Sequence, residues 1–392
     1  DVSTASFIPS RTGGASSLSS ISLTIYGTSW RDNIEGSSKA DIIYGYDGND
    51  AIHGLGGADQ IDAGAGNDLV FVKAASLTDY TKLDGGTGSD TLNFSNPENG
   101  GMGGFPTEAA ITFSLASSGI AQNFENIAGS RYDDQLTGDN NGNIIVGNGG
   151  ADNISGAEGD DYLYGDGSSS ATYADQNAHK NDDYHLNSWA GNDDNLFGGA
   201  GNDYLEGNMG DDTLDGGTGK DTLTGGDGAD SFILRTGDGS STLTDADIIT
   251  DFTDGTDVFK LDSSVVYTDL NIAQGTGSNA NDTIISKGSE YLAILEGISA
   301  SNVNYLDFTS TATSSQNFTG TTGNDVFIGA AGGDTFTTNI GTDVILGWNG
   351  DDAITVDGTG TKTIDGGSGT DSLNINISAD IKDFSIAYKN IN

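Results

Sequence analysis

The stretch GGAGNDYLE-GNMGDDTLD-GGTGKDTLT-GGDGADSFI, residues 198–233, decides the fold of this chain. It consists of four successive nine-residue units, each a Gly-rich turn followed by Asp, one variable residue and one apolar residue. Units of this pattern, written GGxGxDxUx with U apolar, occur twenty times among the 392 residues. A fixed nine-residue period predicts a solenoid in which each unit stacks on its neighbours.

The apolar position is the strictest feature of the repeat. Only 34% of the chain is hydrophobic, yet U is apolar in every unit. This regularity predicts a core that is one side chain wide per strand. The residues at U are Ile34, Ile43, Ile52, Ile61, Val70, Leu92, Leu136, Ile145, Ile154, Leu163, Leu196, Leu205, Leu214, Leu223, Phe232, Phe327, Phe336, Ile345, Ile354 and Leu373.

The spacing within one unit predicts how the chain coils. Positions 1–6 form a turn in which glycine permits a positive φ and close backbone approach. Positions 6–9 form a short strand, where alternation points Asp at position 6 and U at position 8 to the same side. Because the chain reverses in each turn, two units complete one coil, and coils stack ~4.8 Å apart through parallel strand hydrogen bonds. The sequence therefore predicts an all-β parallel β-roll.

The charge of the chain indicates what the turns bind. The net charge is -44, from 58 acidic and 14 basic residues. Such a composition is typical of disorder, but disorder gives no reason for a nine-residue repeat. Only 8 of the acidic residues are Glu, and a short Asp carboxylate beside a tight turn suits a calcium site. We expect self-repulsion to unfold the chain without cations and calcium to fold it.

The composition also excludes several classes of protein. There is no basic patch to bind nucleic acid, and no apolar run approaches the ~18 residues of a membrane span. The absence of Cys is compatible with an exported protein stabilised by metal rather than by disulfides. No signal peptide is visible, and because the chain starts at Asp1 we interpret it as processed or as a fragment.

We expect four blocks of repeats separated by other segments. The expected organisation is an N-terminal strand or cap (1–26), roll block 1 (27–71), an interrupting β segment (72–128), roll block 2 (129–164), a polar insertion loop (165–188), roll block 3 (189–233), a capping β segment (234–317), roll block 4 (318–374) and a C-terminal β tail (375–392).

With this repeat the chain resembles the RTX family, bacterial proteins exported by type I secretion. The resemblance implies a right-handed parallel β-roll that holds each Ca²⁺ between two turns eighteen residues apart. Asp carboxylates at position 6 and earlier backbone carbonyls would supply about six oxygen ligands. The segment DIITDFTDGTDVF, 247–259, also resembles the strand pair that closes such rolls, and we expect it to cap block 3.

The resemblance implies about ten calcium sites. Asn143 replaces an acid in one of them, and Asp90 and Asp371 have no partner at eighteen residues. The implied pairs are Asp32 with Asp50, Asp41 with Asp59, Asp50 with Asp68, Asp134 with Asp152, Asn143 with Asp161, Asp194 with Asp212, Asp203 with Asp221, Asp212 with Asp230, Asp325 with Asp343 and Asp334 with Asp352.

A catalytic site is not expected. None of His53, His179 and His185 lies in an HExxH motif, no G-x-S-x-G motif occurs, and the many Asp pairs are explained as calcium ligands. The insertion at 168–189 gathers His179, Lys180, Asp182, Asp183, Tyr184, His185 and Trp189. It could hold a second metal or a glycan, although a polar surface loop is the simpler interpretation.

The leading hypothesis is a secreted, calcium-binding structural protein at the cell surface. It would self-associate as a subunit of a surface layer, filament or adhesive matrix, with a cell-surface polysaccharide as a further partner. One alternative is the C-terminal repeat region of a larger RTX enzyme, acting on polysaccharides or proteins, which a much longer gene product would favour. The other is a glycan-binding module, which glycan-array binding would favour.

Overall fold

The structure is a computed structural model that describes residues 6–7, 21–72, 77, 80–94, 109–117, 119–166, 192–376 and 384–391. The chain divides into two compact units, Asp1–Gly228 and Ala229–Asn392. The described residues form β-strands joined by turns, with 3-10 turns at η2 (Leu115–Ser117), η3 (Leu243–Asp245), η4 (Tyr267–Asp269), η5 (Gly277–Asn279) and η6 (Tyr305–Asp307). They contain no helix with both the length and the hydropathy of a membrane span.

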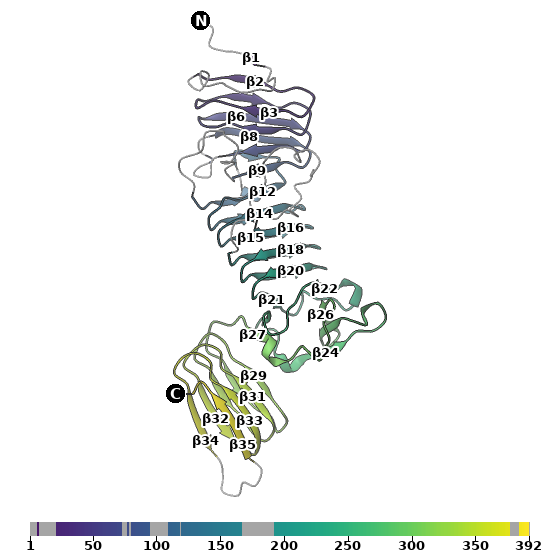
Figure 1. Ribbon diagram of the computed structural model, residues 1–392, viewed down its shortest axis with the longest axis vertical. Helices are drawn as coiled ribbons and strands as arrows, with labels where there is room; N and C mark the ends of the chain where they lie inside the picture. The colour runs from purple at the N-terminus through teal and green to yellow at the C-terminus, as the bar shows by residue number, and fades with distance from the viewer. Residues whose placement is uncertain are drawn as a thin grey trace. The chain divides into compact units, whose positions relative to one another are not determined.

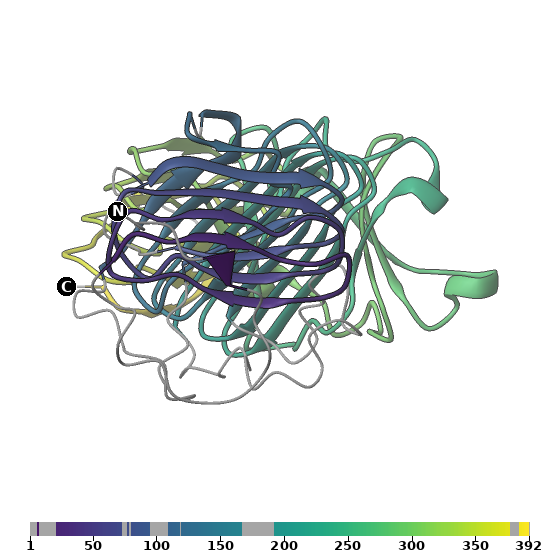
Figure 2. The same cartoon turned by 90° about the horizontal axis from the view of Figure 1, so that it is seen from above.

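The first unit is a stack of parallel coils, drawn from purple to teal in Figure 1. Figure 2, which looks along this stack, shows successive coils lying over one another. Its first sheet contains β1 (Ser6–Phe7), β2 (Thr24–Tyr26), β4 (Ile42–Tyr44), β6 (Asp59–Ala65), β8 (Tyr80–Thr87) and β11 (Ala121–Gln122). A second sheet contains β3 (Asn33–Glu35), β5 (Ala51–His53), β7 (Leu69–Phe71), β9 (Thr91–Asn93), β12 (Asn126–Ala128), β14 (Ile144–Asn148), β16 (Tyr162–Asp166), β18 (Tyr204–Met209) and β20 (Thr222–Asp227). The third contains β10 (Thr112–Ser114), β13 (Gln135–Thr137), β15 (Asn153–Glu158), β17 (Asn195–Ala200) and β19 (Thr213–Thr218).

The strand register aligns the U residues of successive coils into columns. In one column Ile34 is paired with Ile52, Ile52 with Val70, and Val70 with Leu92. Nineteen of the twenty U residues are buried, and Leu373, in the last coil, is half-buried. The predicted all-β roll with a one-residue-wide core is confirmed. Most of the repeat strands begin at position 7, one residue later than expected, and many continue into the next turn.

The expected interruption at 72–128 does not break the stack. β8 pairs in parallel with β6, and β12 pairs with both β9 and β14, so these strands supply further coils. Leu83 fills the U column opposite Ile61 although its unit lacks the Gly-rich motif. Blocks 1, 2 and the first part of block 3 therefore form one continuous roll. The interruption is a property of the sequence pattern rather than of the fold.

The second unit opens with the segment that we expected to cap block 3. It contains β21 (Ser231–Leu234), β22 (Asp247–Ile249), β23 (Val258–Leu261), β24 (Leu270–Gln274), β25 (Thr283–Lys287), β26 (Glu290–Leu295) and β27 (Phe308–Ser310). β21, β23 and β27 pair in parallel, whereas β24, β25 and β26 form an antiparallel meander. The turn at Asp254-Gly255 is present, and Phe252, Phe259 and Phe308 form a buried aromatic cluster beside it.

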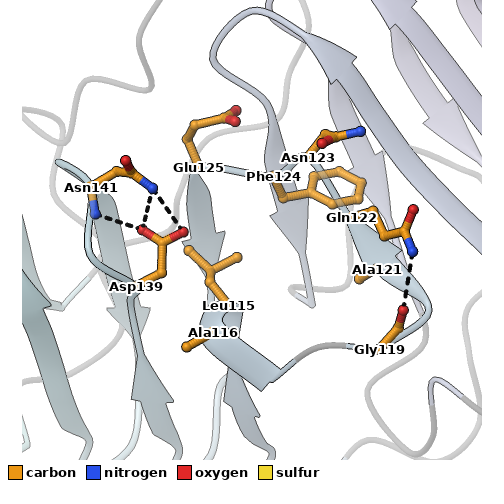
Figure 3. A pocket seen from close by; sticks show the side chains of 10 residues that line it. All are labelled: Leu115, Ala116, Gly119, Ala121, Gln122, Asn123, Phe124, Glu125, Asp139 and Asn141. Carbon is orange, nitrogen blue, oxygen red and sulfur yellow. Dashed lines mark hydrogen bonds between the residues drawn. The ribbon is translucent and has the colours of Figure 1, made fainter.

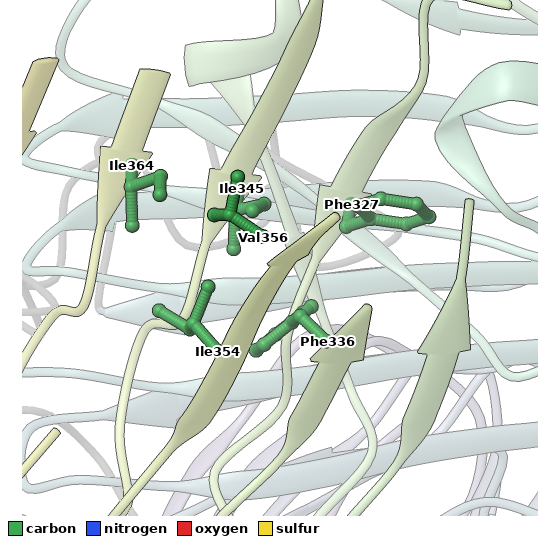
Figure 4. Close-up of a cluster of buried hydrophobic side chains, with 6 residues drawn as sticks. All are labelled: Phe327, Phe336, Ile345, Ile354, Val356 and Ile364. Atoms are coloured by element: carbon green, nitrogen blue, oxygen red, sulfur yellow. The ribbon is translucent and has the colours of Figure 1, made fainter. Parts of the chain in front are cut away.

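A roll of two four-stranded parallel sheets completes the second unit. One sheet contains β28 (Asn317–Thr319), β30 (Thr335–Thr337), β32 (Ala353–Asp357) and β34 (Ser372–Asn376). The other contains β29 (Val326–Ile328), β31 (Asp343–Leu346), β33 (Gly360–Asp365) and β35 (Phe384–Lys389), so the predicted tail also belongs to the roll. Figure 4 shows Phe327, Ile345 and Ile364 of one sheet facing the other. The facing side chains are Phe336, Ile354 and Val356.

The thin core of this roll predicts a large cost for truncating a U residue. Ile354→Ala should lower the free energy of unfolding by about 2–5 kcal/mol, because the buried cavity cannot collapse between two sheets. Ile340→Ala, at a side chain that is 49% exposed, is the matched control and should change it by less than about 0.5 kcal/mol. Urea unfolding in excess calcium, followed by circular dichroism, measures both. Equal effects would contradict the one-residue-wide core.

Candidate metal sites

The Asp at position 6 links each turn to the turn one coil away. Its Oδ1 accepts a hydrogen bond from the backbone N–H of the position-6 residue of the preceding coil. The Asp134 N–H lies 2.8 Å from Oδ1 of Asp152, and the Asp50 N–H lies 2.8 Å from Oδ1 of Asp68. All eighteen predicted ligands are buried except Asp32, which is half-buried.

Nine of the ten predicted pairs are brought together by this hydrogen bond, at 2.7–3.0 Å. The nine are Asp32 with Asp50, Asp41 with Asp59, Asp50 with Asp68, Asp134 with Asp152, Asn143 with Asp161, Asp194 with Asp212, Asp203 with Asp221, Asp325 with Asp343 and Asp334 with Asp352. The number of calcium ions that they hold stays a prediction.

Asp221 and Asp230, the last two predicted ligands of block 3, fall in different units. Asp221 belongs to the first unit, where its Oδ1 accepts the Asp203 N–H at 2.9 Å as predicted. Asp230 belongs to the second unit, so its predicted pair with Asp212 of the first unit stays a prediction. The predicted pairs of block 3 stop at Asp230, but the row of hydrogen bonds continues. The Asp230 N–H donates to Oδ1 of Asp257 at 3.0 Å, so the row continues into the capping segment across twenty-seven residues.

Four further pairs have other spacings, and the eighteen-residue rule missed them as well. Two of them include Asp90 and Asp371, which have no partner at a spacing of eighteen residues. Two of these pairs span the insertion. They are found when each repeat unit is paired with the second unit after it, regardless of the number of residues in between. The other two require the degenerate units with Leu83 and Ile364 at U. The pairs are Asp68 with Asp90 at 2.8 Å, Asp152 with Asp194 at 2.6 Å, Asp161 with Asp203 at 2.7 Å and Asp352 with Asp371 at 2.9 Å.

The second carboxylate oxygen, Oδ2, divides the turns into two groups. In what we term capped turns, the backbone N–H at position 2 donates to Oδ2, as Ser130 does to Asp134 at 2.5 Å. In open turns Oδ2 is buried and has no hydrogen-bond partner. The capped turns are those of Asp32, Asp41, Asp134, Asp257, Asp325 and Asp334. The open turns include those of Asp50, Asp68, Asp90, Asp152, Asp161, Asp203, Asp352 and Asp371.

The backbone at position 2 differs between the two groups. In open turns it has a positive φ, which is 75° at Tyr46, 85° at Ala157 and 68° at Trp348. A side chain with a Cβ adopts this conformation at a cost of about 1–2 kcal/mol. Strain of this kind is retained where it serves a function. In the open turns the positive φ at position 2 occurs together with an Oδ2 that accepts no hydrogen bond from a backbone N–H. This oxygen is therefore available to another ligand.

Burial makes the ionised form of these carboxylates costly without a cation. It raises the pKa of Asp152 to about 9 and that of Asp194 to about 8. Burial likewise raises the pKa values of Asp50, Asp68 and Asp161 to about 7. Neighbouring position-6 carboxylates add to the shift in each case, since like charges oppose ionisation. A bound divalent cation would remove both penalties.

The turn geometry fits a cation with oxygen ligands. A methyl group at Gly147 would overlap both Oδ2 of Asp152 and the carbonyl oxygen of Gly165, so carboxylate and carbonyl oxygens converge where no side chain fits. No three His, Cys, Asp or Glu side chains converge within the described ranges. Backbone carbonyls would therefore supply most ligands, which calcium accepts readily.

The polar insertion leaves the roll from inside one of these turns. Residues 167–191 lie outside the described residues, and with them His179, His185 and Trp189. On either side of them, Asp166 and Asp194 are both buried, and a methyl group at Gly165 would overlap Oδ2 of Asp194. The insertion thus begins after position 2 of a turn. In this turn, as in the open turns, Oδ2 of the position-6 Asp lies against the glycine at position 1.

A cavity of about 670 Å³ lies where the repeat pattern is weakest, between η2 and the turn around Asn141 (Figure 3). Its two carboxylates have structural contacts: Glu125 accepts the Asp90 N–H at 2.8 Å, and Asp139 accepts the Asn141 N–H at 2.8 Å. Glu125 occupies position 6 of a degenerate unit. The cavity therefore belongs to the roll, and its acids replace regular turn residues.

His53, the only histidine that the structure describes, is part of the core. It is 2% exposed and stacks on Phe71 with 3.9 Å between ring centroids. Burial lowers its pKa to about 4, so it is neutral at physiological pH. This position gives it a packing role.

Comparison with known proteins identifies the repeat. The model of the RTX calcium-binding nonapeptide repeat matches residues 26–61, 35–70, 123–154, 137–169, 190–223, 206–240 and 319–354, which together make up a little under half of the chain. These stretches of the chain are RTX calcium-binding nonapeptide repeats. The predicted repeat family, the β-roll fold and calcium as the metal that such repeats bind are therefore confirmed. No curated protein matches the chain significantly.

Two solved structures are similar over part of the chain. The extracellular lipase LipA from Serratia marcescens is 16% identical, with a TM-score of 0.17, over 76% of this chain and 40% of the lipase. The AlgE6R3 subunit of the Azotobacter vinelandii mannuronan C5-epimerase is 23% identical, with a TM-score of 0.16, over 46% of this chain and 80% of the subunit. This chain therefore spans less than half the length of the lipase.

The raised pKa values predict an inverted pH dependence for the metal-free protein. A carboxyl whose pKa is higher in the folded than in the unfolded state contributes stability below the unfolded pKa of 3.8. That contribution is lost as the pH rises through the folded values of about 7 to 9. The metal-free protein should therefore lose several kcal/mol, to order of magnitude, between pH 4 and about 9.

Thermal unfolding of metal-stripped protein, with and without added calcium, tests this dependence. Calcium should abolish the loss of stability at high pH, because the bound ion compensates the buried charge. A metal-free protein that becomes more stable between pH 5 and 8 would show that these carboxylates do not carry the predicted penalty.

Open and capped turns should differ in their contribution to calcium binding. Asp152→Asn should lower the number of ions bound per chain, because its Oδ2 has no other partner. Asp134→Asn, one coil earlier, should have a smaller effect, because the Ser130 N–H already satisfies that oxygen. Isothermal titration calorimetry with metal-stripped protein measures the number of bound ions. Equal losses in the two variants would show that the distinction has no bearing on calcium binding.

Proposed function

We propose that this protein is a secreted structural subunit that assembles outside the cell when calcium folds its rolls. A surface layer, an extracellular filament or an adhesive matrix are assemblies of this kind. Type I secretion suits such a chain, because most of its coils stay unfolded where calcium is scarce and fold where calcium is abundant. The protein acts through its repeating surface and catalyses no reaction.

The open end of the second roll carries this proposal. Among the described strands, β34 and β35 each have one hydrogen-bonded neighbour, so each presents a free edge. The last coil also exposes apolar side chains, with Ile375 44% and Tyr388 62% exposed. A free parallel edge beside exposed apolar groups favours addition of another strand. A second copy of the chain supplies such a strand.

The side of the first unit offers a further contact surface. Tyr26, Tyr44 and Tyr46 form a cluster of nearly parallel rings with each pair of centroids 5.6–6.3 Å apart. Each ring is at least 36% exposed. Exposed tyrosine is common in protein interfaces because it is both apolar and hydrogen-bonding. Lateral contacts between copies, or with a cell-surface polysaccharide, would use this face.

The test of the proposal is calcium-dependent assembly. Purified full chain should be monomeric in chelator and form regular filaments or sheets when calcium is added, as seen by light scattering and negative-stain electron microscopy. Ile375→Glu should block assembly while leaving the calcium-bound fold intact, because it places a charge on the free edge.

Ile340→Glu is the control for that variant, since Ile340 is 49% exposed but lies on a turn of the same roll. It should assemble like the wild type. Protein that remains monomeric at all calcium concentrations, while its circular dichroism shows a calcium-dependent roll, would rule out the structural assembly and leave calcium binding untouched.

A further inference from the structure

Lys362 occupies the position of a calcium-ligating Asp in the second roll. It stands at position 6 of the unit DGTGTKTID, residues 357–365, with Ile364 at U. In the parallel pairing of β31 with β33, Lys362 lies directly opposite Asp343. The roll thus contains one coil in which a basic residue replaces the acid.

The Lys362 side chain is buried inside a turn, surrounded by oxygen atoms. Its Nζ lies 2.6 Å from Oδ2 of Asp343, and both side chains are completely buried. The same Nζ lies 2.7 Å from the carbonyl oxygen of Asn339, 2.8 Å from that of Gly341 and 3.3 Å from that of Thr359. An ammonium group has three N–H donors, which the three carbonyl oxygens accept, and the contact with Asp343 is an ion pair.

These oxygens are of the kind that the repeat offers to a metal ion. Asp343 is position 6 of its turn, and Asn339 and Gly341 are positions 2 and 4 of the same turn. Thr359 belongs to the turn stacked one coil away. The set therefore combines one Asp carboxylate with backbone carbonyls from two turns nineteen residues apart.

We propose that Lys362 is a covalently attached cation that takes the place of a calcium ion in the turn at 338–343. The spacing rule assigns Asp343 to a calcium site, but the oxygen that an ion would use is bound to the lysine instead. A buried charge needs a partner of opposite sign, and the ammonium supplies it without depending on the medium. The proposal rests on calcium binding by the repeats and not on assembly.

The substitution makes one coil of the second roll independent of calcium. β31 and β33 remain joined through the ion pair when the other turns lose their ions. This coil also lies next to β35, at the end of the roll that carries the free edge. An ordered template for the remaining turns is therefore present at low calcium.

The experiment measures local protection and bound calcium in the full chain. Hydrogen–deuterium exchange by mass spectrometry, in calcium and in chelator, compares the turn at 338–343 with the open turn at 147–152. Inductively coupled plasma mass spectrometry counts calcium ions per chain after desalting. The variants are Lys362→Met, Lys362→Asp and, as a matched control on an exposed lysine, Lys220→Met.

We expect chelator to reduce protection at 147–152 by at least about tenfold and to leave 338–343 of the wild type nearly unchanged. Lys362→Met should lose protection at 338–343 in both media, by about tenfold or more, because it strands a buried carboxylate. Lys362→Asp should restore protection there in calcium only and bind one ion more than the wild type. Lys220→Met should behave as the wild type does.

The proposal is overturned if chelator exposes 338–343 of the wild type as much as 147–152. It is equally overturned if Lys362→Asp gains no ion while the other turns bind theirs. A wild type that binds no calcium anywhere would refute both this proposal and the proposed function. Calcium binding without assembly would refute only the latter.

Discussion

The hydrogen bond from the backbone N–H of one position-6 residue to the position-6 carboxylate one coil later stabilises the stacking of coils within each of the two rolls. It recurs along both rolls at 2.6–3.0 Å, whatever the number of residues between the two partners. It commits one oxygen of each Asp to the stack and orients the other toward the turn. The fold therefore creates a row of buried carboxylates in which one oxygen is hydrogen-bonded within the stack and the other is not. Because a buried charge is costly, these carboxylates must be neutralised for the protein to remain folded.

The structure neutralises these carboxylates in three ways. In capped turns a backbone N–H donates to the second oxygen, and in open turns a residue with a positive φ at position 2 leaves this oxygen available to a cation. In one turn Lys362 provides a permanent charge. The three solutions differ in their dependence on the surroundings, because only the open turns need a supply of ions. Stability is thus divided between calcium-dependent and calcium-independent coils along the same chain.

Much of the fold follows from the repeat, because a nine-residue period leaves little freedom. The U column, the burial of the position-6 residues and nine of the ten Asp pairs agree with it. What the spacing missed are coils whose motif has decayed, such as those of Leu83 and Glu125, where register and hydrogen bonding persist without glycine or Asp. The repeat also does not predict which turns are capped and which are open, since the two groups differ in the backbone φ at position 2. Ala157 and Ala330, the same residue at the same position, belong to different groups.

The insertion in the turn between Asp166 and Asp194 shows that the number of residues in the chain does not fix the number of coils in the roll. Asp152 and Asp194 stack as directly as Asp134 and Asp152, although forty-two residues rather than eighteen separate them. An insertion at a turn adds residues without adding coils, because the residues on either side of it belong to the same coil. Such a roll can acquire new chemistry along its flank while its ends, and hence the spacing of any polymer built from it, stay the same.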